Sequence, residues 1–272
     1  DKKSKIIGDE RMKNFYPFVC SLLFNILVVY NLYGAELAIV DFADQWTKVT
    51  GLRDTLDEFK IEYDDYTKGI ENGKLAFTRQ NKVFFIGSMT TNNAKLHQGL
   101  DNNAEVIQEF VKKGGLVMEP TQADQNEDNV DWLPEGLICV RTDTDLPVFK
   151  IKKPKHPLFQ SPHRLTDKDF ENWGHQNWPT VWEMIKSHKG FTVIAESTGG
   201  PAIMEAVYGK GKFVMMCIAP DKYYVAGNDD NTRKKARMFM ENMLEAFVLS
   251  KPWTIDSRTK LTTKWSILKT TR

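Results

Sequence analysis

Apolar runs and helical patterns alternate along the first half of the chain. Four short apolar runs are each typical of a buried β-strand. Between them, residues 44–59 and 103–113 repeat apolar side chains every three or four positions, which predicts amphipathic helices. Gly114 and Gly115 end the second helix, because glycine readily adopts the left-handed conformation that closes a helix. The predicted strands are residues 36–42, 60–66, 82–88 and 116–119.

The second half of the chain is less regular. Seven of the eleven prolines fall between residues 120 and 180, where we expect long loops and a strand at 137–141. A short helix is predicted at 182–187 and an amphipathic helix at 232–249. A Gly-Lys-Gly turn at 209–211 predicts a hairpin between the last two of three further strands. These strands are residues 191–197, 202–208 and 212–219.

Repeated strand, helix, strand units imply a parallel sheet that is covered by helices on both faces. We therefore predict an α/β fold of the three-layer α/β/α type, with a flavodoxin-like, parallel-centred sheet. The strands expected in this sheet are residues 38–41, 83–87, 116–119, 191–195 and 213–218.

The N-terminal segment has the features of an export signal. Residues 15–35 carry no charge and follow Arg11 and Lys13, as the apolar core of a signal peptide follows its basic region. An apolar run of this length also nearly crosses a hydrocarbon layer of about 30 Å, so an uncleaved membrane anchor is the alternative. Residues 1–35 are thus expected outside the globular core, with residues 36–249 secreted, periplasmic or anchored to a membrane through this segment.

Composition and charge narrow the class of protein only modestly. Of 272 residues, 41% are hydrophobic and 27% charged, as in an ordinary globular protein. The formal net charge of +1 gives no reason to expect a nucleic-acid partner. Residues 250–272 form a basic tail, to which we assign no function. Cys139 and Cys217 follow the apolar segment; a single disulfide is open to them, but two cysteines are too few for a disulfide scaffold.

The carboxyl ends of the predicted parallel strands form the expected functional edge. Ligands of such sheets bind in the crevice outside these ends. The proline-rich excursion at 120–180 is expected to border the same crevice. The candidate ligand-binding residues are Asp41, Gly87, Ser88, Glu119, Gln122, Asp124, His156, Trp173 and His175.

Two histidines of the excursion have two interpretations. His156 and His175 could join Glu119, Gln122 and Asp124 in a set for metal binding or general acid–base chemistry. Alternatively, they cap or hydrogen-bond the loops in which they lie. No metal-ligand spacing of the H-E-x-x-H kind is present, so we expect neither a metal nor a cofactor.

Three tryptophans of the excursion also have two interpretations. Trp173, Trp178 and Trp182 lie within ten residues and have amide side chains between them. Exposed aromatic rings beside amides suit sugar rings, which stack through C–H faces and hydrogen-bond through hydroxyls. Alternatively, the tryptophans pack the excursion onto the sheet.

The order of the later elements carries a family resemblance. A Gly-Gly stop precedes the run LVMEP, and HPLF at 156–159 precedes DFENWG at 169–174. The run GGPAIMEAVYGKGKFVMMCIAP and a final helix follow. In this order, residues 36–249 resemble the class I glutamine amidotransferase-like superfamily. Within it they resemble the branch of ThuA-like proteins and accessory domains of some glycoside hydrolases.

The resemblance implies a nucleophilic cysteine on a sharp turn after the Gly-Gly strand. The corresponding segment, residues 118–124, contains no cysteine. Cys139 and Cys217 lie within apolar strands, where cysteine behaves as a small buried hydrophobe. We therefore expect no hydrolysis of glutamine through a thioester.

Two functions remain open at this point. The first is an exported, non-catalytic domain on a degenerate amidotransferase-like fold that binds a ligand or partner, with a small molecule or carbohydrate expected. The alternative is a hydrolase or isomerase that acts on a sugar-like substrate through histidine and carboxylate residues. The missing nucleophile favours the first, and the oligomeric state is not determined by the sequence.

Overall fold

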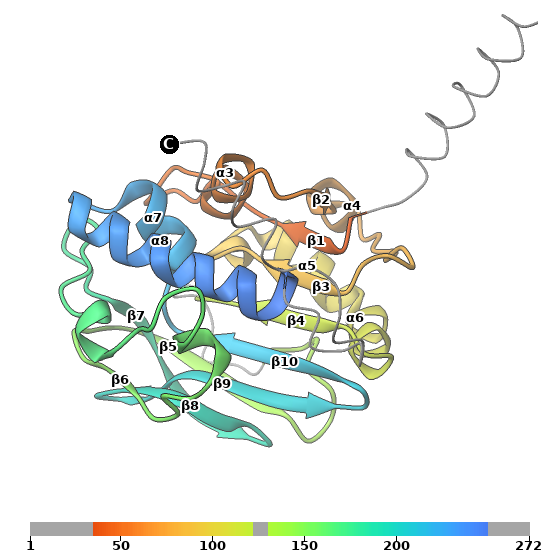
Figure 1. Ribbon diagram of the computed structural model, residues 1–272. Helices are drawn as coiled ribbons and strands as arrows, with labels where there is room; N and C mark the ends of the chain where they lie inside the picture. Colours follow the sequence, from red (N-terminus) through yellow and green to blue (C-terminus); the bar gives the residue numbers. More distant parts are fainter. Residues whose placement is uncertain (1–34, 122–129, 250–272) are drawn as a thin grey trace, which may run out of the picture.

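An eight-stranded, mostly parallel sheet forms the centre of the molecule (Figure 1). The computed structural model describes residues 35–121 and 130–249. The sheet order is β2-β1-β3-β4-β10-β9-β8-β6, in which the first five strands are parallel and the last three pairings are antiparallel. A second sheet pairs β5 with β7. The strands are β1 (Leu37–Val40), β2 (Tyr63–Asp65), β3 (Val83–Ile86), β4 (Leu116–Glu119), β5 (Ile138–Leu146), β6 (Phe149–Ile151), β7 (Val181–Lys189), β8 (Thr192–Ser197), β9 (Gly200–Tyr208) and β10 (Gly211–Met216).

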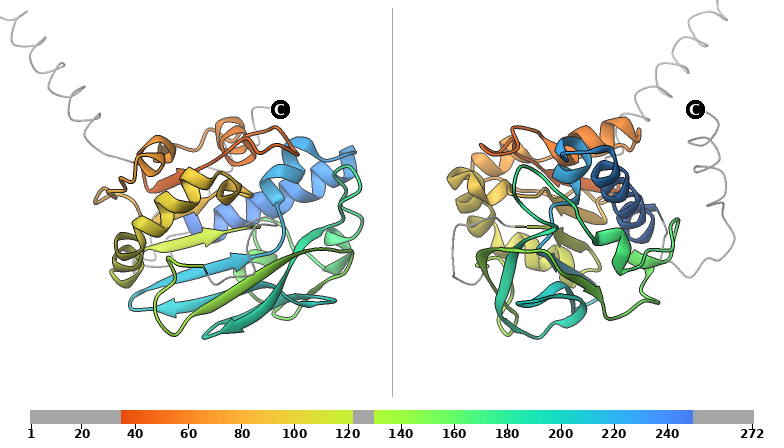
Figure 2. Two further views of the ribbon diagram at one scale, coloured as in Figure 1. Left: turned by 180° about the vertical axis from the view of Figure 1, so that it is seen from behind. Right: turned by 90° about the vertical axis from the view of Figure 1, so that its left-hand side faces the viewer.

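Helices cover both faces of the sheet, which confirms the three-layer α/β/α prediction (Figures 1 and 2). One layer contains α3 (Gly51–Glu58), α7 (Pro220–Ala226) and α8 (Asp230–Leu244). The other contains α4 (Thr67–Glu71), α5 (Ala94–Asn102) and α6 (Ala104–Lys112). Short helical turns are η1 (Thr90–Asn92), η2 (Pro157–Phe159), η3 (Asp167–Phe170) and the π-helical η4 (Glu245–Leu249).

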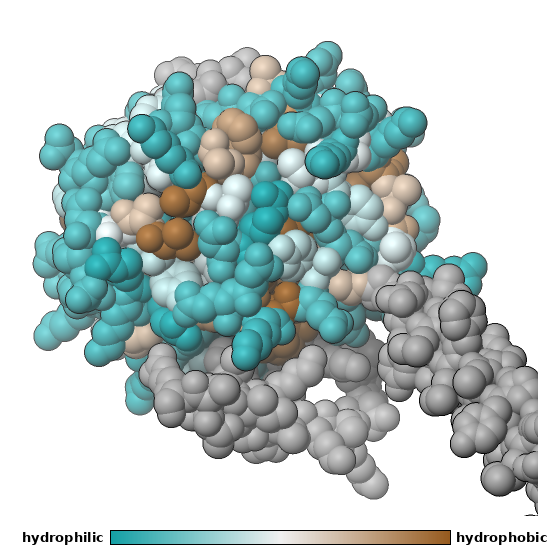
Figure 3. All heavy atoms as spheres, turned by 90° about the horizontal axis from the view of Figure 1, so that it is seen from above, coloured by the Kyte–Doolittle hydropathy of each residue, from teal (hydrophilic) through white to brown (hydrophobic). Residues whose placement is uncertain are grey.

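Burial of the central strands explains their sequences. Every residue of β1, β3 and β4 is buried, because helices cover both sides of a parallel strand and leave no face for polar residues. The surface seen from above in Figure 1, over α3, β2 and α4, is by contrast mostly hydrophilic, with separate small apolar patches (Figure 3).

Two predicted helices differ from the structure. The helix predicted at 44–59 begins only at Gly51, because the Asp44 carboxylate accepts hydrogen bonds from the amides of Trp46 and Thr47 and folds this stretch into a turn. The short helix predicted at 182–187 is wrong. These residues belong to strand β7, which pairs with β5, and pairing with a strand some 40 residues away overrides a weak local pattern.

The terminal predictions fall outside the described residues. The predicted export segment lies there except for Ala35, and the basic tail at 250–272 lies there entirely. Within residues 35–121 and 130–249, no helix is both long enough and apolar enough to cross a membrane.

Candidate functional site

The sheet has a topological switch point between β1 and β3. Counted along the chain with β10 as the fifth, the five parallel strands follow the order 2-1-3-4-5, in which the connection from β1 runs to one side and the connection from β3 runs to the other. In flavodoxin-like sheets the ligand crevice opens at this point, outside the carboxyl ends of the strands. Asp41 directly follows β1, and Gly87 and Ser88 follow β3, so the structure places these predicted residues at the crevice.

Asp41 is held by the backbone around it. One carboxylate oxygen accepts a hydrogen bond from the amide of Phe42 at 2.8 Å, and the other accepts one from the amide of Arg53 at 2.8 Å. The bond to Arg53 fixes the first turn of α3 against the end of β1. A Cβ atom on Gly87 would lie 2.6 Å from the Asp41 carboxylate, so the absence of a side chain at position 87 permits this approach.

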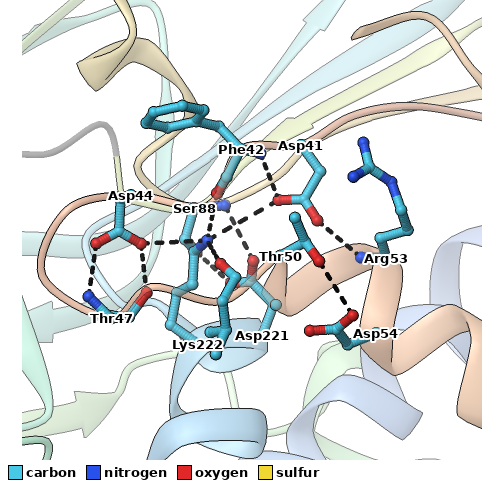
Figure 4. A network of polar contacts seen from close by, with 12 residues as sticks. Asp41, Phe42, Asp44, Thr47, Thr50, Arg53, Asp54, Ser88, Asp221 and Lys222 are labelled. Atoms are coloured by element: carbon cyan, nitrogen blue, oxygen red, sulfur yellow. Dashed lines mark hydrogen bonds and ion pairs between the residues drawn. The ribbon is translucent and has the colours of Figure 1, made fainter.

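Lys222 occupies the centre of the crevice. Its side chain is fully buried, and its ammonium donates hydrogen bonds to the carbonyl oxygens of Phe42 at 2.7 Å and Val49 at 2.6 Å. The same nitrogen lies 3.3 Å from the Asp44 carboxylate and 3.9 Å from that of Asp41 (Figure 4). Helix α7 thus inserts a cation that ties the β1–α3 connection to the end of the sheet.

Asp221, next to Lys222, binds the end of β3. Its carboxylate accepts hydrogen bonds from the Ser88 amide at 3.1 Å and from the Ser88 hydroxyl. Asp41, Ser88, Asp221 and Lys222 are each at most 1% exposed. The switch-point crevice is therefore filled by the chain's own side chains, which we call the switch-point cluster: Asp41, Asp44, Ser88, Asp221 and Lys222 (Figure 4).

Burial shifts the acid–base behaviour of the cluster. Burial raises the pKa of Asp41 to about 7, although the nearby Lys222 ammonium opposes the shift. The pKa of Asp221 is also raised, again by burial. Three buried carboxylates face one ammonium, so uptake of a proton near neutral pH relieves an excess of negative charge.

The raised pKa of Asp41 predicts a loss of stability as the pH rises. Between about pH 4 and pH 7 the folded chain retains a proton that an unfolded aspartate has released, so rising pH favours unfolding until the folded-state pKa is passed. We expect the free energy of unfolding to fall by about 3 kcal/mol from pH 5 to pH 8 through this group. Urea unfolding of the wild-type chain and of Asp41→Asn measures it.

Asp41→Asn should flatten this dependence, whereas Asp54→Asn, which changes an exposed carboxylate on the nearby helix α3, should leave it unchanged. The ¹³C shift of the Asp41 carboxyl in the wild-type chain should titrate near pH 7. A midpoint near 4 would contradict the prediction.

A second buried charge cluster lies at the end of β4, at the position that the resemblance assigns to a nucleophile. The Arg141 guanidinium lies 2.8 Å from the Glu119 carboxylate and 3.7 Å from that of Glu183, and all three side chains are at most 2% exposed. Arg141 also donates to the carbonyl oxygen of Pro120 at 3.1 Å. Glu119 is thus part of an internal ion-pair cluster with Arg141 and Glu183.

Both described cysteines are buried free thiols. Burial raises the pKa of Cys139 to about 12 and raises that of Cys217 well above its ordinary value. A thiol attacks as the thiolate, so neither side chain supplies a nucleophile at neutral pH.

The predicted histidines do not meet Glu119 but have separate partners. His156 caps η2 and lies 3.5 Å from the Glu205 carboxylate. Burial opposes ionisation of Glu205, but hydrogen bonds from His156 and Lys212 lower its pKa to about 2. The Nδ1 atom of His175 contacts the Ala226 carbonyl oxygen at 2.5 Å, at the end of α7.

Of the remaining predicted residues, Trp173 is buried and donates its indole N–H to the carbonyl oxygen of Asp169 at 2.7 Å. Gln122 and Asp124 lie outside the described residues. Within the part of the chain that the structure describes, no group of three or more His, Cys, Asp or Glu side chains could hold a metal ion.

An open hollow of about 270 Å³ lies beside the filled crevice, in the loop that carries the tryptophans. Trp178 is half-buried there and meets Trp46 of the β1–α3 connection edge to face, at 6.5 Å between ring centroids. The Gln176 amide donates to the Trp46 carbonyl oxygen at 3.3 Å, which ties the loop to the same connection. We call this space the tryptophan hollow; its lining residues are Pro147, Asn172, Trp173, Gly174, Gln176, Asn177, Trp178, Pro179 and Thr180.

Sequence reasoning missed the cations that organise both clusters. Asp221 and Lys222 come just after the strand predicted at 212–219, separated from it by one proline, so the strand-end argument that selected Asp41 also applied to them. Arg141 ends the apolar strand predicted at 137–141. An arginine that is buried in such a strand needs carboxylate partners, and this was the signal for an internal ion pair. Glu183 carried no such signal, because its segment was predicted as a helix.

Comparison with known proteins shows a likeness of fold alone. No family model and no curated protein matches the sequence. The chain is similar to the cytoplasmic protein STM1381 from Salmonella typhimurium LT2, with 14% identity, a TM-score of 0.49 and coverage of 78% of this chain and 98% of that one. It is also similar to a glutamine amidotransferase from Thermotoga maritima, with 13% identity, a TM-score of 0.42 and coverage of 77% and 83%.

A β-galactosidase from Rahnella sp. R3 is similar at 12% identity and a TM-score of 0.45, where the overlap spans 78% of this chain but only 31% of the enzyme. None of these similarities transfers an activity, a ligand or a compartment to this chain.

Proposed function

We propose that this chain is an exported, non-catalytic binding domain that holds a carbohydrate-like ligand in the tryptophan hollow. One observation carries the proposal: the crevice where this fold would hold a substrate is filled by the switch-point cluster, whereas the hollow beside it is open and lined by a half-buried Trp178. A binding role needs only this open surface.

The lining of the hollow suits a polyhydroxylated ring. Asn172, Gln176 and Asn177 are exposed and present amides, each of which both donates and accepts hydrogen bonds. Trp178 supplies an aromatic surface for the C–H face of a sugar. The volume of about 270 Å³ is just below the roughly 300–1,000 Å³ of typical small-molecule pockets, so it suits one sugar unit.

The backbone presents the amides in fixed positions. Asn172 and Gln176 have left-handed φ angles of 59° and 53°, a conformation that asparagine tolerates but that is uncommon for glutamine without support from its surroundings. Asn228 supplies this support at Gln176, because its side chain accepts a hydrogen bond from the backbone N–H of Gln176 at 2.7 Å and donates one to the backbone carbonyl oxygen of Gln176 at 2.9 Å. Such preorganisation reduces the entropy lost on binding.

The binding role is tested at Trp178. With methyl glycosides of glucose, galactose and mannose as probes, we expect saturation-transfer NMR signals from at least one glycoside. Trp178→Ala should weaken binding of that glycoside about tenfold or more, since a stacked ring contributes roughly 1.5 kcal/mol to the binding free energy. Titration calorimetry measures the loss.

A matched pair of asparagine variants separates binding from folding. Asn177→Ala removes an exposed amide of the hollow, whereas Asn231→Ala removes an exposed amide at the start of α8. Only Asn177→Ala should weaken binding of the glycoside. The absence of saturation transfer from all three probes, or equal effects of the two variants, contradicts the proposal.

Export and ancestry belong to the same proposal. The uncharged run at 15–35 supports export, and N-terminal sequencing of the secreted chain should find its start near Glu36 if the run is cleaved. The 2-1-3-4-5 strand order and the lack of a cysteine after β4 support descent from the amidotransferase-like superfamily, on its ThuA-like or glycosidase-accessory branch.

A second candidate function, sugar hydrolysis or isomerisation, has one observation in its favour. Glu119 Oε1 and His175 Nε2 are buried without a hydrogen-bond partner among the described residues. Release of nitrophenol from nitrophenyl glycosides that is lost in both Glu119→Gln and His175→Gln would support this function over simple binding.

A further inference from the structure

A second and larger hollow lies at the opposite edge of the sheet. It has a volume of about 670 Å³ and lies at the amino ends of β3 and β4, between residues 75–82 and α6. It shares no lining residue with the tryptophan hollow or with the switch-point cluster. We call it the amino-edge hollow.

The amino-edge hollow has an aromatic floor. Phe77 and Phe110 stack with ring centroids 4.1 Å apart and planes 28° apart, and both are half-buried. A Cβ atom on Gly115 would lie 2.4 Å from the Phe110 ring, so glycine at 115 leaves the space that the ring occupies. Val106, which is 37% exposed, extends the apolar surface.

The rim of the hollow is cationic. Arg79, Lys82 and Lys113 line it together with a single acid, Glu109, so three positive charges face one negative charge in a chain whose formal net charge is only +1. Lys113 lies 3.7 Å from Glu109, and within the described ranges the only partner of the Lys82 ammonium is the carbonyl oxygen of Arg79, at 3.3 Å.

Arg79, like Lys82, has no ion pair among the residues that the structure describes. Its guanidinium has no hydrogen-bond or ion-pair partner within residues 35–121 and 130–249. Such a guanidinium is a ready partner for an anion, because its fork of N–H donors matches carboxylate, sulfonate and phosphate groups.

We propose that the amino-edge hollow binds a small organic anion, with a flat apolar body against Phe77, Phe110 and Val106 and an acidic group at Arg79 and Lys82. Its volume falls in the range of typical small-molecule sites, and an apolar lining with a few polar groups at the rim is their usual composition. The uncharged run at 15–35 of the same chain is a poorer occupant, because it offers nothing to the cations.

A pair of naphthalene probes tests the required charge. The full chain in a nonionic detergent is titrated by calorimetry with 2-naphthalenesulfonate and with the neutral 2-naphthalenemethanol, and a detergent blank is subtracted. We expect the sulfonate to bind at least tenfold tighter than the alcohol and its affinity to fall with added salt. Equal affinity for the two probes, or no saturable binding of the sulfonate, overturns the proposal.

Variants of exposed residues locate the site without threatening the fold. Arg79→Gln and Lys82→Gln should each weaken binding of the sulfonate about fivefold, while Lys150→Gln, at an exposed position on the edge strand β6, should not. Val106→Asp should weaken binding of the sulfonate further, while Val207→Asp, at a position on β9 that is 74% exposed, should have no effect. Equal effects of site and control variants overturn the proposal.

A membrane is the competing partner for a basic face, and vesicles distinguish it. Sedimentation with phosphatidylglycerol vesicles that is abolished by Arg79→Gln and Lys82→Gln, without any binding of 2-naphthalenesulfonate, would assign this face to anionic lipid and overturn the small-ligand proposal. Loss of glycoside binding at the tryptophan hollow has no bearing on this result, because the two sites share no residue.

Discussion

Replacing Lys222 with methionine should lower the free energy of unfolding by about 3–5 kcal/mol at pH 7. The substitution keeps most of the side-chain volume but removes an ammonium that is fully buried. The carbonyl oxygens of Phe42 and Val49 then lose a donor, and the carboxylates of Asp41 and Asp44 lose their cation. Loss of one partner of a buried ion pair costs this much, because it leaves the other charge uncompensated. Urea denaturation measures the change.

Two further variants identify the cause of the loss. Lys234→Met, at an exposed position on α8, should change stability by less than about 0.5 kcal/mol. Adding Asp44→Asn to Lys222→Met should recover part of the loss, because the second substitution removes one of the uncompensated charges. A cost below about 1 kcal/mol for Lys222→Met would show that the cluster does not hold the crevice closed.

The result also distinguishes a structural cluster from an active site. Side chains that are arranged for catalysis or binding commonly cost stability, so their replacement often stabilises the fold. A large loss at Lys222 would mean that the switch-point cluster closes the crevice. The open tryptophan hollow would then be the better place for a ligand at this edge of the sheet.

The parallel core could be predicted from the sequence because its signals are local. The runs at β1, β3 and β4 are apolar at nearly every position, since both faces are covered, and each lies between recognisable helices or turns. Strand β7 has no such local signal. Its polar and apolar residues do not alternate regularly, and its extended conformation depends on pairing with β5.

The candidate site was predictable only in part, for a related reason. Asp41, Ser88 and Glu119 follow from the rule that functional residues lie at strand ends, and the structure places all three there. Whether such a residue faces solvent depends on what covers it. The cations Lys222 and Arg141 come from segments far away in the sequence, and their insertion turns an apparent binding edge into a buried one.

Replacing Arg141 with methionine should lower the free energy of unfolding by about 3–5 kcal/mol at pH 7, which is comparable to the loss expected for Lys222→Met. The guanidinium lies between Glu119 and Glu183, which are 1% and 2% exposed. Without the guanidinium, two carboxylates repel one another in a poorly solvated space. Urea denaturation at pH 7 measures the loss.

The geometry of the guanidinium adds a second test of the same cluster. Arg141→Lys keeps the charge but loses the fork that reaches both Glu119 and the carbonyl oxygen of Pro120. The free energy of unfolding of Arg141→Lys should therefore lie between that of the wild-type chain and that of Arg141→Met. Arg164→Met, at an exposed position, is the matched control and should be nearly neutral. If Arg141→Met were also neutral while a nitrophenyl glycosidase activity disappeared, the position after β4 would be catalytic after all. Because the guanidinium contacts the carbonyl oxygens of Glu119 and Pro120 as well as a carboxylate, we expect the structural outcome.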